Sequence, residues 1–186
     1  MKTLLSIVVA GFLVAGCGGG EKTEQLINRG KALLAEGKFD DAAAELKKAT
    51  EADKTSMEAW LQLGNAYAAQ KKHDEALSAY VTAKRADRHA VAPHVAHAKV
   101  QIALGRVELA TTELNFVVEM DPKNFEALIL LGKVSQLPHK QPDGSIGVTR
   151  LDLERAELNL EAAVALAPQN AEAQAELAKL RKALGK

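Results

Sequence analysis

The sequence predicts an all-α solenoid of four helix–turn–helix repeats that ends in a capping helix. Three observations support this fold class. Residue types recur every 34 residues, small side chains return at one position of that period, and aromatic residues make up only 4% of the 186 residues while alanine is abundant. Small apolar side chains let helices pack closely, whereas strands favour aromatic and β-branched residues.

The composition also limits the classes of function. The 24 Lys and Arg residues balance 24 Asp and Glu residues, so the formal net charge is zero, without the basic excess that is typical of nucleic-acid binders. Hydrophobic residues form 47% of the chain, which is enough to bury a core. The single cysteine cannot form an internal disulfide or a cysteine-rich zinc site.

The first element is a predicted signal peptide over residues 1–16. Lys2 supplies a positive charge, and the apolar run over residues 4–15 is shorter than the roughly 20 residues of a membrane-spanning helix. The segment Val14–Cys17 (VAGC) resembles the lipobox of bacterial lipoproteins. This resemblance implies cleavage before Cys17 and acylation of that cysteine with fatty acids such as palmitate. The alternative is a free cysteine in an ordinary signal or anchor.

A lipid on Cys17 would anchor the protein to a membrane. Lipoproteins of this kind carry several acyl chains, and stable attachment needs about two such signals. Residues 17–22 then form the lipidated cysteine and a short glycine-rich tether. No aspartate follows Cys17. By the sorting pattern of Gram-negative lipoproteins, this implies the outer membrane, with the protein facing the periplasm.

Residues 23–170 divide into four copies of one pattern, over 23–56, 57–90, 91–124 and 125–170. Each copy predicts two antiparallel helices, because apolar residues recur at helical spacing and turn signals separate the two halves. In the last copy the second helix arrives 12 residues late. The positions that carry the period are Leu26, Trp60, His94 and Leu128; Gly30, Gly64, Ala98 and Gly132; and Leu46, Tyr80, Leu114 and Leu160.

The segment Trp60–Tyr67 (WLQLGNAY) resembles the tetratricopeptide repeat, and Ala76, Tyr80 and Ala83 complete that copy. The resemblance covers residues 23–170. It implies a right-handed solenoid in which the first helices of the copies line a concave groove. One helix pair cannot bury its apolar face alone, so at least three copies must stack.

Two further elements complete the chain. Residues 137–148 contain two prolines and two glycines and predict a loop between the two helices of the fourth copy. This insertion is either functional or a tolerated surface insertion, and the sequence leaves both open. Residues 171–186 predict a helix with a charged face, which is the polar cap that a solenoid needs.

The sequence contains no motif typical of an enzyme. It has no phosphate-binding glycine loop, no metalloprotease helix and no nucleophile elbow. His94 and His97 are three residues apart on one predicted helix and could hold a metal. The repeat period, however, puts both at core positions, where packing explains them. We therefore expect no catalytic residue, no metal site and no cofactor.

The candidate binding surface follows from the resemblance, which implies that the first helices line a groove. One row of this face is apolar, and a row one helical turn further on is mainly basic. We expect the groove to bind an amphipathic helix or an extended peptide with some acidic character. The alternative is that the apolar row only packs against neighbouring helices. The apolar row is Ile27, Leu61, Val95 and Ile129, and the lysine row is Lys31, Asn65, Lys99 and Lys133.

Together these features predict a non-catalytic adaptor or scaffold that binds another envelope protein and no nucleic acid. The lipoproteins that the chain resembles assemble pili, secretins and export complexes. Two alternatives stay open. The protein is a scaffold that self-associates through its end helices, or an accessory subunit of a periplasmic enzyme that uses the 137–148 insertion.

Overall fold

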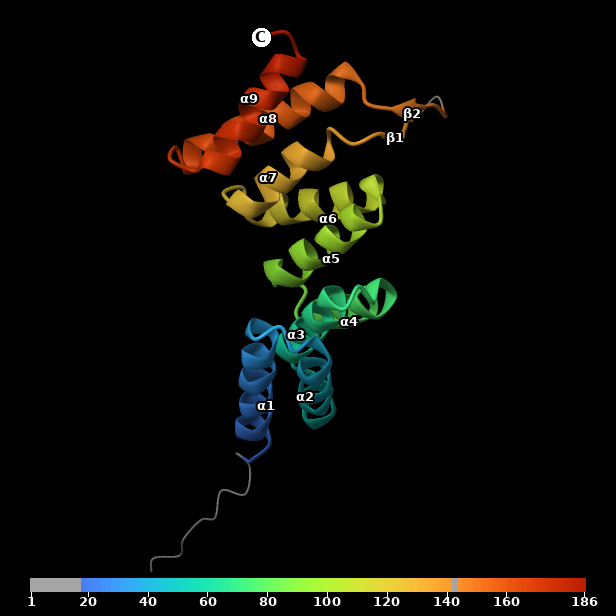
Figure 1. Ribbon diagram of the computed structural model, residues 1–186, viewed down its shortest axis with the longest axis vertical. Helices are drawn as coiled ribbons and strands as arrows, with labels where there is room; N and C mark the ends of the chain where they lie inside the picture. The colour runs from blue at the N-terminus through green and yellow to red at the C-terminus, as the bar shows by residue number, and fades with distance from the viewer. Residues whose placement is uncertain (1–17, 142–143) are drawn as a thin grey trace, which may run out of the picture.

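Helices that stack in chain order form an elongated solenoid (Figure 1). The computed structural model describes residues 18–141 and 144–186. Within these residues, the predicted all-α solenoid with a terminal helix is confirmed. The elements are α1 (Gly18–Ala35), α2 (Phe39–Ala52), α3 (Met57–Ala69), α4 (His73–Ala86), α5 (Val91–Ala103), α6 (Val107–Met120), α7 (Phe125–Val134), β1 (His139–Lys140), β2 (Ile146–Gly147), α8 (Arg150–Leu166) and α9 (Ala171–Ala183).

In the first, second and fourth repeats, glycine at the helix crossing faces a large residue on the partner helix. A Cβ atom on Gly30 would lie 2.4 Å from Leu46 Cγ, and one on Gly132 would lie 2.4 Å from Leu160 Cγ. Gly64 meets the Tyr80 ring in the same way, at 2.4 Å from Cε1. The helices of one repeat therefore approach more closely than a side chain at these positions would allow.

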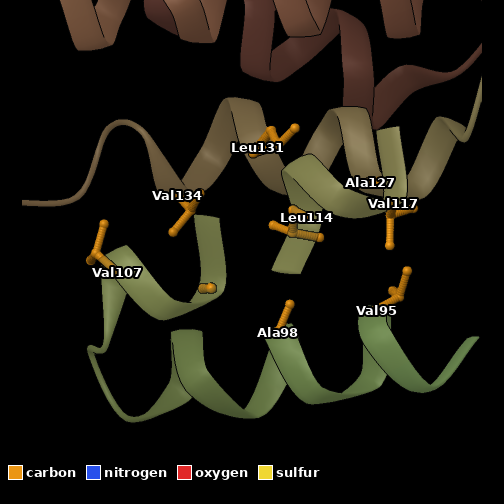
Figure 2. Packing of buried hydrophobic residues seen from close by; sticks show 9 residues of the cluster. Val95, Ala98, Val107, Leu114, Val117, Ala127, Leu131 and Val134 are labelled. Carbon is orange, nitrogen blue, oxygen red and sulfur yellow. The ribbon is translucent and has the colours of Figure 1, made fainter. Parts of the chain in front are cut away.

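Each helix pair completes its core with the first helix of the next repeat. In the third repeat, side chains from α5, α6 and α7 converge on one cluster (Figure 2). Leu114 and Val117 of α6 are fully buried between Val95 of α5 and Leu131 of α7. Burial of one such leucine contributes about 2 kcal/mol. A single repeat would leave this face open to water, so stability depends on stacking.

Helix starts follow the repeat period. Ser56, Asn124 and Asn170 occupy the position before α3, α7 and α9, and each side chain accepts a hydrogen bond from a backbone N–H of the first turn. Such a cap stabilises a helix by about 1 kcal/mol. The same position before α5 is Ala90, which forms no side-chain cap. The third repeat thus starts without this contribution.

The 137–148 insertion contains a short hairpin, where the sequence predicts only a loop. β1 and β2 pair antiparallel, with His139 opposite Gly147 and Lys140 opposite Ile146. The Lys140 backbone N–H donates to Glu108 Oε1 at 3.0 Å, so the hairpin is fixed to α6. Strands of two residues show no alternation of polar and apolar side chains, and the sequence pattern therefore could not reveal them.

The predicted signal peptide over 1–16 and Cys17 lie outside the described residues. α1 begins at Gly18, so it includes residues that the sequence predicts to form a tether. Helix propagation adds a hydrogen bond for each residue fixed, which offsets the poor helix propensity of glycine next to a packed helix. None of the described helices combines the length and hydropathy that crossing a bilayer requires.

Candidate binding groove

The apolar row lies on the first helices α1, α3, α5 and α7, and its side chains are buried. Ile27, Leu61, Val95 and Ile129 are only 5–7% exposed. Ile27 packs with Ala49 and Ala59, which come from α2 and α3. This burial fits the packing alternative, because these four side chains offer little free area to a partner. The groove itself stays a prediction.

The lysine row carries three ion pairs between successive first helices. Lys31 Nζ lies 3.3 Å from Glu58 Oε1 of α3, and Lys133 Nζ lies 3.0 Å from Glu172 Oε1 of α9. Lys99 pairs in the same way with Glu126 of α7. All three lysines are about half exposed. The positive charge of the lysine row is therefore matched by acidic groups in each described pair.

These glutamates form a glutamate row that the sequence reasoning missed. Glu58, Glu126 and Glu172 all stand in the first turn of a first helix or of the cap. A carboxylate at this place also interacts favourably with the helix dipole. The signal was present in the sequence, because the three positions follow the same repeat register as the lysines.

The lysine row and the glutamate row together form a ladder of ion pairs between successive first helices. One step of this ladder, between α3 and α5, carries no ion pair among the described residues, and we refer to it as the charge gap. Here Asn65 takes the place of a lysine on α3, and Ala92 takes the place of a glutamate on α5. Asn65 Oδ1 accepts a hydrogen bond from Tyr80 Oη at 2.9 Å, and Asn65 Nδ2 donates to Gln62 Oε1 at 3.2 Å. Burial raises the pKa of Tyr80 to about 12, so its hydroxyl remains a donor at neutral pH.

A pocket of about 630 Å³ opens at the charge gap. Leu61 and Asn65 of α3 contribute to its lining, as do Ala92, Val95 and Lys99 of α5. A second pocket of about 420 Å³ follows along the groove and shares Lys99 and Glu126 with the first. The two pockets together run along the first helices from α3 to α9.

His94 and His97 belong to a polar cluster between α4, α5 and α6. Glu113 of α6 accepts from Lys84 Nζ at 2.5 Å and lies 2.7 Å from His94 Nδ1. His97 Nδ1 lies 3.3 Å from Glu113 Oε1 without hydrogen-bond alignment. The sequence reasoning missed Glu113, because this repeat position varies from copy to copy and gave no signal.

Burial and the Lys84–Glu113 ion pair determine the charges of this cluster. Burial, together with the Lys84 ammonium, lowers the pKa of His97 to about 4, so its ring is neutral at pH 7. Burial alone would raise the pKa of Glu113, but hydrogen bonds from Lys84 and His94 outweigh it and hold that pKa below its usual value. Lys84 thus provides the cation for Glu113. Among the described residues, no group of three or more His, Cys, Asp or Glu side chains is arranged to hold a metal.

Comparison with known proteins agrees with the fold. The family model described as tetratricopeptide repeat matches residues 27–90. No curated protein matches the sequence. Among solved structures, pilF of Pseudomonas aeruginosa is similar with a TM-score of 0.77 at 20% identity, over 90% of this chain and 71% of that chain. MamA from Desulfovibrio magneticus RS-1 is similar with a TM-score of 0.73 at 21% identity, over 90% of this chain and 88% of that chain.

A third structure contains a bound peptide. The first tetratricopeptide repeat domain of Spaghetti, bound to the HSP90 peptide SRMEEVD, is similar with a TM-score of 0.60 at 25% identity, over 72% of this chain and 97% of that chain. Residues 27–90 match the tetratricopeptide repeat, and the described chain as a whole has the fold of tetratricopeptide repeat proteins, as its sequence predicts. This fold and these neighbours indicate a scaffold for protein–protein interaction.

Proposed function

We propose that this protein is a lipid-anchored, non-catalytic adaptor of the bacterial envelope, which holds a peptide segment of another envelope protein against its first helices. The observation that carries the proposal is the pocket of about 630 Å³ at the charge gap. The charge gap is the step of the described lysine row at which no ion pair connects neighbouring first helices. A peptide can enter between Asn65 and Ala92 without separating a pair of charges, and the Lys99–Glu126 ion pair borders the same pocket.

The Asn65 side chain suits a peptide backbone. An amide oxygen has two lone pairs and an amide nitrogen has two hydrogens. Tyr80 uses one lone pair and Gln62 uses one hydrogen. One acceptor site and one donor site remain, which is what one peptide unit of a partner can satisfy. Because every peptide unit offers these groups, Asn65 would hold the backbone while the pocket selects the side chain.

The pocket favours an aliphatic side chain of the partner. Leu61, Val91 and Val95 contribute apolar atoms to its lining, and Ala92 leaves it open. An acidic segment would compete with the glutamate row for Lys99 and the other lysines. We therefore propose a partner segment that is uncharged at the charge gap and acidic only at its flanks.

The location of the protein rests on the resemblance of Val14–Cys17 to a lipobox. We propose that lipid on Cys17 anchors the chain to the outer membrane, with the solenoid in the periplasm. By the same resemblance, the partner is a subunit of a pilus, secretin or export complex. Replacing Cys17 with Ala should abolish incorporation of a palmitate analogue and release the protein from the membrane fraction.

The test of the groove is affinity capture of the anchored protein from gently solubilised envelopes, with three chains compared. The first is the parent. The second carries Asn65→Lys and Ala92→Glu, which would close the charge gap with a fourth ion pair. The third carries Ala44→Glu on α2, a matched exposed alanine away from the first helices. We expect the parent and the control to retain the partner. The double variant should capture about ten-fold less of it, because the new ion pair would close the charge gap; this ratio corresponds to about 1.4 kcal/mol of binding free energy. Equal capture by all three folded chains would refute the groove.

A further inference from the structure

Exposed large apolar side chains are concentrated on one part of the solenoid. Of seven such residues in the described chain, six lie on α6, on β2 and on α8. They are Leu109, Phe116, Ile146, Leu151, Leu158 and Leu166. Large exposed apolar patches usually mark interaction sites, and α8 alone carries three of these residues.

The repeat pattern does not require these residues. The position of Leu158 in the fourth repeat is occupied by Ala44, Ser78 and Thr112 in the earlier copies. None of these is a large apolar residue. Leu158 is large and apolar, but 67% of it is exposed. Leu151, seven residues before it, is 55% exposed. Core packing of the solenoid therefore does not explain the apolar face of α8.

Two pairs of positions on α8 are complementary about its midpoint. Leu158 is the central residue of this helix of 17 residues. Leu151 and Ala165 lie seven residues to either side of it, so the three form one stripe along the helix. Arg155 and Glu161 lie three residues to either side and carry opposite charges.

We propose that two copies of this chain pair through the outer faces of α8, with the helices antiparallel and a two-fold axis at Leu158. In this arrangement each residue faces the one at equal distance on the other side of Leu158 in the second copy. Arg155 of each copy then lies level with Glu161 of the other and reaches it across the stripe, and Leu151 lies level with Ala165. A two-fold interface of this kind is self-complementary, and opposite charges at matching places fix its register.

The groups around α8 agree with this pairing. Arg155 forms no ion pair with any described residue, so its charge is available to a partner. Glu161 accepts from Arg181 through Oε1, which leaves its second oxygen for an arginine of the other copy. A pocket of about 580 Å³ between α6 and α8, lined in part by Asn115 and Leu158, gives room for the ridge of the second helix.

The test is cysteine cross-linking of the full chain in the cells that produce it. Leu158→Cys brings two thiols together at the two-fold axis, whereas Ala44→Cys puts a thiol at the equivalent exposed position of α2. The parent chain gives the background from Cys17. We expect mild oxidation to cross-link Leu158→Cys about ten-fold more than Ala44→Cys, because pairing raises the effective thiol concentration above that of random collisions.

A charge exchange in the Leu158→Cys chain tests the register. Arg155→Glu should lower the cross-linked yield several-fold, since two carboxylates would then face each other. Arg155→Glu combined with Glu161→Arg should restore the yield. Equal cross-linking of Leu158→Cys and Ala44→Cys would overturn the pairing. If the cross-linked yield is the same with and without the two charge variants, the antiparallel register centred on Leu158 is overturned.

Discussion

Removing the carboxylate of Glu113 should destabilise the solenoid strongly. This group holds together α4, α5 and α6, because it accepts from Lys84 at 2.5 Å and contacts His94 at 2.7 Å. A hydrogen bond to a charged group contributes about 1.5–3 kcal/mol. Breaking a fully buried ion pair costs about 3–5 kcal/mol, because one charge is left without a partner.

The structure puts the expected cost at the lower end of this range. The Lys84 side chain keeps 16% of its exposure and the Glu113 side chain keeps 19%. Water can therefore solvate part of the ammonium that Glu113→Ala leaves behind. We expect a loss of about 3 kcal/mol in the free energy of unfolding for Glu113→Ala. Lys84→Met in the same chain should recover about half of it, since the stranded charge is then absent.

The assay is urea unfolding at pH 7, followed by circular dichroism at 222 nm. A double-mutant cycle of Lys84→Met and Glu113→Ala gives the interaction energy, which should be about 1.5–3 kcal/mol for groups in direct contact. Glu119→Ala, an exposed glutamate on the same helix, is the control and should change stability by less than about 0.5 kcal/mol. If Glu113→Ala costs no more than the control, or if the cycle gives no interaction energy, the reasoning is refuted.

Two further predictions concern packing and pH. Gly132→Ala should cost about 1–3 kcal/mol of unfolding free energy through overpacking, because its Cβ would lie 2.4 Å from Leu160 Cγ; in a Leu160→Ala chain the cost should nearly vanish, and an unchanged cost would contradict the close approach. Acidification from pH 7 towards pH 4 should lower the melting temperature, because unfolded His97 takes up a proton below about 6.5 while the folded ring resists protonation until about pH 4. His97→Leu should flatten this pH dependence, and an identical slope in the variant would rule out His97 as its source.

The solenoid could be predicted because its contacts are local and repeat. Gly30 and Leu46 establish the distance between two helices. The same pair of positions recurs as Gly64 with Tyr80 and as Gly132 with Leu160. A period of 34 residues therefore gives the fold without any long-range information. The hairpin of the insertion repeats nowhere in the chain, and its contact with Glu108 joins parts of the sequence that no pattern connects.

The depth of the apolar row could not be predicted from the period. A residue such as Val95 meets the core of its own repeat on one side and the groove on the other, and periodicity does not say which side covers it. In the structure, nearly all of the Val95 side-chain surface is buried in the core. Since all four repeats bury this row to the same degree, it cannot distinguish one partner from another. If the proposed groove binds a partner, its selectivity would come from positions where the repeats differ on the exposed side. Asn65 and Ala92 are such positions, because they interrupt the ion pairs that connect the other described steps of the lysine row.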